Sequence, residues 1–253
     1  MKRTLVLSLC TVLIFSCKEE KKPASESVTE LTTEVVEAVV SDNDWTVLPL
    51  EKWQAFKGGE VASFWKAEGE EIVFYPPTAE ERKKPDGGRE SFNIVTKDAY
   101  TSFKLSLEWK ISEAGNSGIM WGVSEDEKYG EPYQTGLEVQ ILDNEKHPDG
   151  KNGTSHQAGA LYDLVSPAED VTKPVGEWNL AVITINHETN EGTSSLNGVE
   201  VAKFPVNGDA LNTLLKGSKF DGWDGFGAYK TGKIALQDHG DVVSFRNIKI
   251  KEL

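Results

Sequence analysis

The sequence predicts an all-β domain built as a two-sheet β-sandwich or jelly roll. Short runs rich in β-branched and aromatic residues follow one another along the chain, and Gly, Asn, Asp and Pro separate them. Residues 103–110 show the pattern most clearly, because apolar side chains occupy every second position. A helical pattern occurs only briefly, around residues 210–215. Many short strands with turn residues between them are typical of antiparallel sandwiches.

The chain begins with a segment typical of targeting signals, residues 1–17. Lys2 and Arg3 give a basic start, and the apolar run at 5–15 is too short to span a bilayer. This run ends in Ile-Phe-Ser-Cys, which resembles a bacterial lipobox whose cysteine carries the lipid. We therefore expect a lipidated Cys17 to anchor the protein in the outer membrane, on its periplasmic or cell-surface face. An ordinary secretory signal with a chance cysteine is the alternative.

Residues 18–43 and 44–253 differ in composition, which predicts a tether followed by one domain. The first stretch is rich in Glu, Ser, Thr and Lys and has no aromatic residue, as expected for a disordered acidic tether. All seven tryptophans lie from Trp45 onward, and this part is long enough to bury a core. Cys10 lies in the leader, so the mature domain has no thiol for a disulfide or a nucleophile.

The charge of the chain argues against nucleic-acid binding. The formal net charge is −14, and loss of Lys2 and Arg3 with the leader shifts it to −16. Such a chain repels nucleic acid and anionic lipid, so contact with the membrane is expected through the lipid anchor only. A neutral substrate is electrostatically more plausible than a phosphorylated one. The acidity is also sufficiently explained by solubility.

Further segments along the domain have the composition of strands. Residues 71–75 and 179–185 are apolar runs rich in β-branched or aromatic residues. The segment 194–201 contains an Asn-Gly pair of the kind that closes a tight hairpin. Residues 242–250 alternate again between apolar and polar side chains. These segments complete the strand pattern expected of a sandwich.

One segment places a carboxylate and an amide side by side in an apolar strand. Residues 137–142 read Leu-Glu-Val-Gln-Ile-Leu, and side chains two positions apart share a face of a strand. Glu138 and Gln140 therefore point one way, while Val139 and Ile141 point into the predicted core. A carboxylate beside an amide suits a polyhydroxylated ligand and proton transfer. The simpler interpretation is a strand with one solvated face.

Short motifs along the domain occur in the order of a known family. They are Gly-Asn-Ser-Gly-Ile at 115–119, Leu-Glu-Val-Gln-Ile-Leu-Asp-Asn at 137–144, Ala-Gly-Ala-Leu-Tyr at 158–162, Gly-Glu-Trp-Asn at 176–179, Leu-Asn-Gly at 196–198, Gly-Lys-Ile-Ala-Leu-Gln-Asp-His at 232–239 and Phe-Arg-Asn-Ile at 245–248. Together they resemble the 3-keto-disaccharide hydrolase family, which is common among bacterial lipoproteins. The resemblance covers residues 45 to 253.

This resemblance implies a concanavalin-like two-sheet β-sandwich that binds sugars on a concave sheet. It also implies cleavage of glycosides or oligosaccharides that are already oxidised to a ketone at C3, and it places Glu138 in the sugar site. Many members carry an Arg shortly after the Asn-Ser-Gly-Ile run, where this chain has Trp121 and Gly122. A flat aromatic side chain at that position could stack on a sugar ring.

A ketone at C3 acidifies the proton at C2, so cleavage can proceed by elimination and subsequent addition of water. That route needs a base, a group that stabilises the enolate and an acid for the leaving oxygen. Glu138 and Asp143 are carboxylates near one strand end, and His156 is an imidazole, a side chain often used in acid–base catalysis. These three are the expected catalytic residues. Retaining and inverting glycosidases also use two carboxylates, so the pair does not select the mechanism.

Other residues are expected to contact the sugar. Asn116 lies near two glycines and could donate to hydroxyl groups, although a β-bulge or strand entry explains the glycines equally well. Tyr133 and Tyr162 could be stacking platforms or core residues. The expected substrate-binding set is Asn116, Trp121, Tyr133, Gln140, Tyr162, Gln237 and His239.

The segment 143–151 is expected to form a loop at the rim of the site. Its spacing matches no strict metal motif, and a solvated acidic turn explains it as well. The residues that could still bind one divalent cation here are Asp143, His147, Asp149 and His156.

Two other classes of function fit the same sequence. A non-catalytic, lectin-like carbohydrate-binding domain is one, because sandwiches host many lectins and a fold does not fix a function. A surface scaffold without a small ligand is the other. Convergence of Glu138, Asp143 and a histidine in one pocket would favour the enzyme, and an aromatic platform without such a cluster would favour the lectin.

Overall fold

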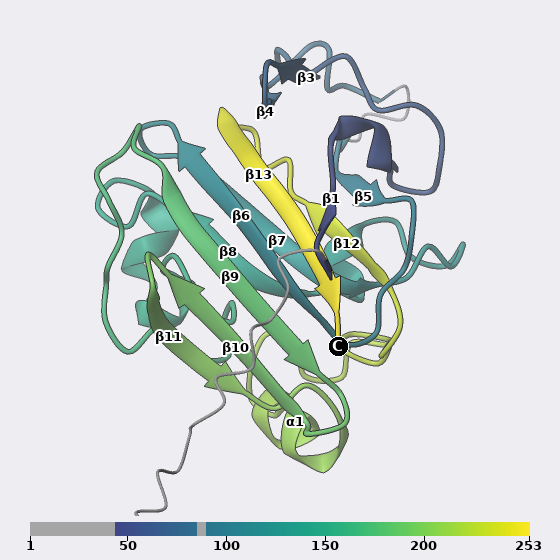
Figure 1. Cartoon of the computed structure of the whole chain (residues 1–253), viewed down its shortest axis with the longest axis vertical. Helices are drawn as coiled ribbons and strands as arrows, with labels where there is room; N and C mark the ends of the chain where they lie inside the picture. Colours follow the sequence, from purple (N-terminus) through teal and green to yellow (C-terminus); the bar gives the residue numbers. More distant parts are fainter. Residues whose placement is uncertain (1–43, 85–89) are drawn as a thin grey trace, which may run out of the picture. The chain divides into compact units, whose positions relative to one another are not determined.

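The computed structural model of the chain describes residues 44–84 and 90–253 (Figure 1). The predicted leader with Cys17 and the predicted tether 18–43 lie outside the described residues. Within the described part, we find no helix with the length and apolar character that crossing a membrane requires.

The larger sheet has eight antiparallel strands in the order β11-β10-β9-β6-β13-β4-β3, with β1 paired to β13. In Figure 1, β9, β6 and β13 run side by side across the front of the view. The bounds are β1 Thr46–Val47, β3 Trp65–Glu68, β4 Glu71–Phe74, β6 Phe103–Ile111, β9 Asn179–Asn186, β10 Glu191–Leu196, β11 Val199–Phe204 and β13 Val243–Glu252.

The smaller sheet has five antiparallel strands in the order β2-β5-β12-β7-β8. Its strands are β2 Trp53–Ala55, β5 Ile94–Thr96, β7 Asn116–Val123, β8 Leu137–Leu142 and β12 Lys233–Leu236. Helix α1 covers Gly208–Leu215, and the 3₁₀-helices are η2 Leu50–Lys52, η3 Pro132–Gln134, η4 Pro148–Lys151 and η5 Thr154–His156.

The core lies between the two sheets and follows from the period of two along each strand. In β6, Phe103, Leu105 and Leu107 are buried together with residues of the facing sheet, such as Ile119 and Ile141. Each sheet therefore presents one apolar face to the core and one face to the outside, as antiparallel sandwiches do. The predicted all-β, two-sheet sandwich is confirmed.

Local predictions also agree with the structure. The Asn-Gly pair closes the β10–β11 hairpin, with Asn197 at φ 52° and Gly198 at φ 87°. Both residues need positive φ in this turn, which asparagine and glycine adopt most readily. Helix α1 contains the short helical pattern expected at residues 210–215.

Candidate functional site

The outer face of the five-stranded sheet carries several polar side chains, including Glu138 and Gln140. In the β7–β8 pairing, Gly118 lies opposite Gln140 and Met120 lies opposite Glu138, so these residues share one face. Val139, on the opposite face, belongs to the core. The predicted division of β8 into a polar and a core face is confirmed.

This polar face is the floor of a cleft with a volume of about 570 Å³. The size falls in the range of small-ligand sites, which are mostly apolar with a few placed polar groups. The cleft is lined by Arg82, Glu90, Ser91, Asn93, Asn116, Glu131, Tyr133, Gly136, Glu138, Gln140, Tyr162, Lys219, Phe220, Trp223, Phe226, Gln237, Asp238 and His239.

Glu138 is the most perturbed acidic group of the cleft. The residue is only 8% exposed. Among the described residues, its carboxylate has no hydrogen-bond partner. Burial raises the pKa of Glu138 to about 8, the Lys219 charge opposes this rise, and the Asp149 charge adds to it. A carboxyl group with this pKa exchanges protons near neutral pH, as a general acid or base must.

Gly118 makes the space that Glu138 occupies. A Cβ atom at position 118 would overlap the Glu138 carboxylate and lie 2.7 Å from its Cδ. The glycine pair therefore serves two purposes, because Gly115 precedes the first residue of β7 while Gly118 gives room to the neighbouring strand. The strand entry expected at Gly115 is confirmed, and the expectation that Asn116 donates to sugar hydroxyls stays a prediction.

Amide side chains surround Glu138 with groups suited to hydroxyls. Asn116 Oδ1 and Gln237 Oε1 are buried and have no hydrogen-bond partner in the described part of the chain, although both side chains line the cleft. Gln140 Oε1 accepts from the backbone N–H of Ile141 at 3.1 Å. A buried, unpaired acceptor is costly until a ligand donates to it. These amides can therefore receive hydroxyl donors from a polyol.

Tyr162 lies at the cleft wall and is held by a chain of polar side chains. Its hydroxyl donates to Asp149 Oδ2 at 2.8 Å, and His156 lies 2.9 Å from Asp149 Oδ1 through Nδ1. His156 Nε2 lies 2.9 Å from Asp163 Oδ1. Burial and the hydrogen bond to Asp149 raise the pKa of Tyr162. Both ring nitrogens of His156 are thus engaged, and His156 is not among the residues that line the cleft.

Asp143 also lies outside the cleft lining. Its Oδ2 accepts from the backbone N–H of Ala114 at 2.7 Å, and its Oδ1 accepts from those of Glu145 and Lys146 at 3.2 Å. It therefore ties the turn after β8 to the turn before β7. The expectation that Glu138, Asp143 and His156 share one pocket is corrected, because the last two side chains satisfy partners elsewhere.

Trp121 lies in the core. It is 4% exposed and stacks on Phe204 with ring centroids 5.8 Å apart and an interplanar angle of 21°. The expectation that Trp121 faces a sugar is corrected, since it lies on the core side of β7, opposite to Gly118 and Met120. The other six residues of the expected substrate-binding set line the cleft, and their contact with a substrate stays a prediction.

Several cleft residues were not found from the sequence. Arg82 and Asp238 form a two-pronged buried ion pair at 2.7 and 2.6 Å, from positions far apart in the chain. Lys219 places its Nζ 3.9 Å from the centre of the Tyr162 ring, and its backbone N–H donates to Asp163 at 2.9 Å. A run of three aromatic residues between 220 and 226 was the available signal for this wall.

Glu131 is a second carboxylate of the cleft that the sequence did not reveal. It lies at the start of η3, where its side chain accepts from the backbone of Gln134 and from Asn93 Nδ2 at 3.1 Å. Burial raises the pKa of Glu131, which favours its protonated form.

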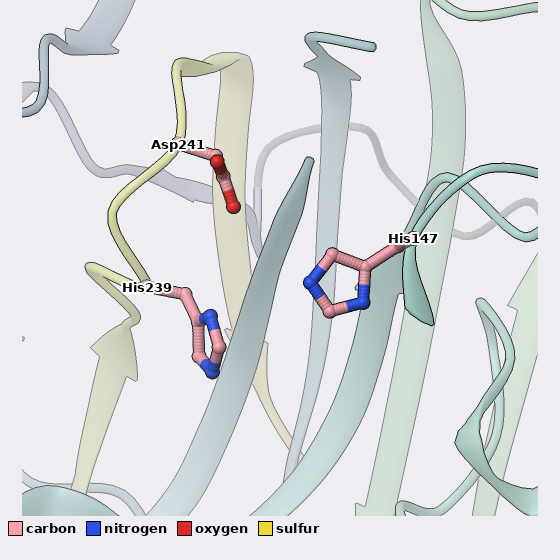
Figure 2. Close-up of side chains that lie close together, drawn as sticks. All are labelled: His147, His239 and Asp241. Atoms are coloured by element: carbon pink, nitrogen blue, oxygen red, sulfur yellow. The ribbon is translucent and has the colours of Figure 1, made fainter. Parts of the chain in front are cut away.

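A cluster of possible metal ligands lies beside the cleft. Figure 2 shows the side chains of His147, His239 and Asp241 facing one another, and their ligand atoms lie within 4.8 Å of one another. Asp241 Oδ2 also accepts from the backbone N–H of Asn116 at 3.1 Å. Two imidazoles and a carboxylate are a donor set used for divalent transition metals.

This cluster corrects the set of ligands expected from the rim loop. Of those four residues only His147 belongs to it, because Asp149 and His156 bond to each other and Asp143 binds backbone amides. His147 Nδ1 accepts from the backbone N–H of Asp149 at 3.1 Å. When the ring is neutral, its proton is therefore on Nε2. Before Nε2 can bind a cation, this proton has to move to Nδ1, and the hydrogen bond from Asp149 is then lost.

Comparisons with known proteins give the family. A family model described as 3-keto-alpha-glucoside-1,2-lyase-like domain matches residues 44–251. A 3-keto-disaccharide hydrolase of Bacteroides thetaiotaomicron is 30% identical in an alignment of 288 positions that covers 98% of this chain and 97% of that protein. A crystal structure from Parabacteroides distasonis, provisionally assigned as a glycosyl hydrolase, is also 30% identical, with a TM-score of 0.72 over 83% of this chain and 94% of its own. The chain therefore belongs to the family of the 3-keto-disaccharide hydrolases, whose domain is the 3-keto-alpha-glucoside-1,2-lyase-like domain.

Proposed function

We propose that the domain cleaves the glycosidic bond of 3-keto-glycosides in the cleft on the five-stranded sheet. The observation that carries the proposal is Glu138, a buried carboxylate whose pKa is raised to about 8 and which has no hydrogen-bond partner among residues 44–84 and 90–253. The cleft also contains buried amide oxygens that can accept hydrogen bonds from a ligand, as expected for a site that binds a polyol. Family membership supports the class of substrate.

In the proposed reaction, Glu138 removes the proton from C2, and the electron pair of that C–H bond delocalises onto the C3 carbonyl oxygen. The enolate then expels the substituent at C1, which leaves with a proton as an alcohol. Water adds at C1 while a proton from solvent adds at C2, so the net change is hydrolysis. A positioned general base contributes roughly 10²–10⁴-fold to such a step.

We assign the protonation of the leaving oxygen to Glu131. It is a further carboxylate of the cleft lining, and its raised pKa favours the protonated form, whereas the Asp238 carboxylate is paired with Arg82. Glu131→Gln should therefore slow substrates with alkoxide leaving groups much more than a nitrophenyl 3-keto-glucoside, whose leaving group needs no acid. Equal slowing of both substrates would exclude Glu131 as the acid.

The test of the reaction compares oxidised and unoxidised glucosides with the purified protein. We expect cleavage of the 3-keto form, no cleavage of the plain glucoside, and deuterium at C2 of the product when turnover takes place in D₂O. A product that keeps its original C2 hydrogen, or efficient cleavage of the plain glucoside, would falsify the elimination route. Binding of both forms without turnover would identify a lectin-like domain instead.

We also propose that a divalent cation binds between His147, His239 and Asp241. The Asn116 N–H already orients the Asp241 carboxylate, as outer-shell partners of metal ligands do. A bound cation would act there as a Lewis acid. Because His147 must first give up a hydrogen bond, we expect weak binding that a chelator reverses. Metal content measured after dialysis against Mn²⁺ or Zn²⁺ should fall to background in His239→Ala, and an unchanged content would refute the site.

The location of the protein is proposed from the sequence. We infer that Cys17 carries a lipid that anchors the protein in the outer membrane. Cys17→Ala should move the protein from the membrane fraction to the soluble fraction, measured by cell fractionation and immunoblotting. A variant that fractionates with the membrane as the wild type does would show that the lipoprotein interpretation is wrong.

A further inference from the structure

We propose that Tyr133 and Trp223 form a second subsite in the cleft, which binds a ring-shaped leaving group of the 3-keto-glycoside. The inference rests on the proposed function and adds to it the residues that bind the leaving group. Both residues are aromatic and exposed to solvent. Tyr133 is 41% exposed and Trp223 is 40% exposed, and both line the cleft although they come from different loops.

Exposed aromatic rings are rare in the described part of the chain. Only Tyr75, Tyr133 and Trp223 are large exposed aromatic side chains there, and two of these three flank the same cleft. Their ring centroids lie 6.3 Å apart with an interplanar angle of 55°. This spacing is too close for a third ring to enter between them, so a ligand ring has to pack against their outer faces.

The position of Trp223 is fixed by the core. Its ring meets Phe220 edge-on at 5.4 Å and 87°, and Phe226 at 6.2 Å and 81°. Phe220 and Phe226 stack on each other at 3.9 Å and 9°, and both belong to the buried core. A ring that is held open to solvent on a rigid support binds without losing much side-chain entropy.

Tyr133 is fixed in a similar way from the other wall. It lies in η3, where Glu131 and Gln134 form reciprocal capping hydrogen bonds and Pro132 is buried. The Gln134 side chain accepts from the Glu131 N–H at 2.8 Å. Glu131, the proposed acid for the leaving oxygen, is thus two residues from Tyr133. A leaving group that packs on Tyr133 is therefore brought close to this acid.

The floor and the rim of the cleft are suited to different parts of the substrate. Glu138 and the unpaired amide oxygens of Asn116 and Gln237 offer hydrogen bonds to a hydroxylated ring. The rim offers two flat apolar faces, which suit the C–H face of a second pyranose or an aryl group. A volume of about 570 Å³ falls in the range for drug-sized ligands, larger than one pyranose requires.

The experiment compares leaving groups in Trp223→Ala and Tyr133→Ala. The substrates are a 3-keto-disaccharide, nitrophenyl 3-keto-glucoside and methyl 3-keto-glucoside. We expect kcat/KM to fall by about tenfold for ring-shaped leaving groups and by less than about twofold for the methyl glycoside. A tenfold fall is about what the loss of one aromatic contact causes. A loss confined to the disaccharide selects a second sugar as the natural ligand, and a loss confined to the nitrophenyl glycoside selects an aryl group. Trp223→Phe should keep most of the activity.

Tyr75→Ala is the matched control, since Tyr75 is 38% exposed and does not line the cleft. It should change none of the three values. Equal losses on all substrates, or no loss on any, would overturn the subsite. If the wild type turns over no 3-keto-glycoside, the proposed function fails, and calorimetric affinities of the same variants for the same three ligands decide the subsite separately. Equal affinities of the disaccharide for Trp223→Ala and wild type would then refute it.

Discussion

The outer faces of the two sheets carry different polar residues, although both follow the same alternation. On the eight-stranded sheet, Glu108 accepts from Arg246 at 3.0 and 3.2 Å, and the hydrogen bond from Arg246 lowers the pKa of Glu108. On the five-stranded sheet, Glu138 has no such partner within the residues that the structure describes, and burial raises its pKa to about 8. One carboxylate is held ionised by a partner, while the other is held ready to exchange a proton.

The loops explain this difference. The Arg246 guanidinium packs over Trp178 at 4.1 Å, and Lys110 approaches the same ring at 4.4 Å, so this face is covered by long, charged and partly exposed side chains. The cleft face is instead shielded by surrounding loops and carries short amides. On a solvated sheet face, charged side chains therefore pair with one another. On a binding face, polar groups that are shielded by loops stay unpaired until a ligand binds.

The largest expected effect comes from substituting both glutamates in turn. Glu138→Gln should keep the fold and lose at least roughly 10²-fold in kcat/KM on 3-keto-glucosides, because the amide cannot accept the C2 proton. Glu108→Gln should remain near the wild-type rate, since Glu108 lies on the other sheet. If Glu138 is the base, the wild-type rate should also rise as the pH increases through about 8. Near-wild-type turnover by Glu138→Gln would remove this residue from the mechanism.

The pH dependence of stability should separate the same two residues. The folded-state pKa of Glu138 lies above the value of an unfolded glutamate, so its favourable contribution is present at low pH and is lost as the pH rises through about 8. Between pH 5 and pH 9, the free energy of unfolding of the wild type should therefore fall by about 4 kcal/mol relative to that of Glu138→Gln. Urea titrations at both pH values measure this fall, and parallel pH profiles would contradict the raised pKa.

Gly118→Ala tests the space beside the carboxylate. The added methyl overlaps the flexible end of Glu138 rather than backbone, so the side chain should move while the fold stays. We expect roughly a tenfold loss of kcat/KM, because a misplaced catalytic group costs rate without unfolding the protein. Gly130→Ala is the control, since its new Cβ meets nothing closer than 3.5 Å. Equal rates in both variants would show that the position of the carboxylate does not limit turnover.

The smallest effect is expected for the stability of Glu108→Gln. The ion pair with Arg246 is partly exposed, and such pairs contribute about 0–1 kcal/mol. The folded-state pKa of Glu108 is lowered, so its contribution is present at neutral pH and fades as the pH falls through that value. Thermal unfolding should show a small loss at pH 7 that becomes smaller as the pH is lowered. A loss of several kcal/mol at pH 7 would mean that this face is more than a solvated surface.

The sequence predicted the features that depend on local periodicity. The core and polar faces of β8, the alternation of β6 and the Asn-Gly hairpin all follow from side-chain spacing or turn chemistry. The same rule could have corrected one error, because Trp121 is an odd number of residues from Asn116 and Gly118 and so falls on the core face.

Long-range and loop features could not be predicted in this way. Asp143 was expected in the site because it follows the strand that carries Glu138, and His156 was expected because imidazole is a common acid–base group. Turns after the strand decide where these side chains point, and both found partners in the loops. Arg82, Glu131 and Trp223 reach the cleft only through the tertiary fold, which no local spacing records.

The buried ion pair between Arg82 and Asp238 has a consequence for the order of folding. Its partners are 156 positions apart, and Asp238 also accepts from the backbone N–H of Phe92 at 3.1 Å. Contacts between distant parts of a chain form slowly, because a long loop must close before they become favourable. The cleft wall that contains this pair should therefore assemble late, after the hairpins of the eight-stranded sheet. Amide protons near Phe92 and Asp238 should then gain protection last in a pulse-labelled refolding reaction, and sugar binding should be recovered only in that final phase.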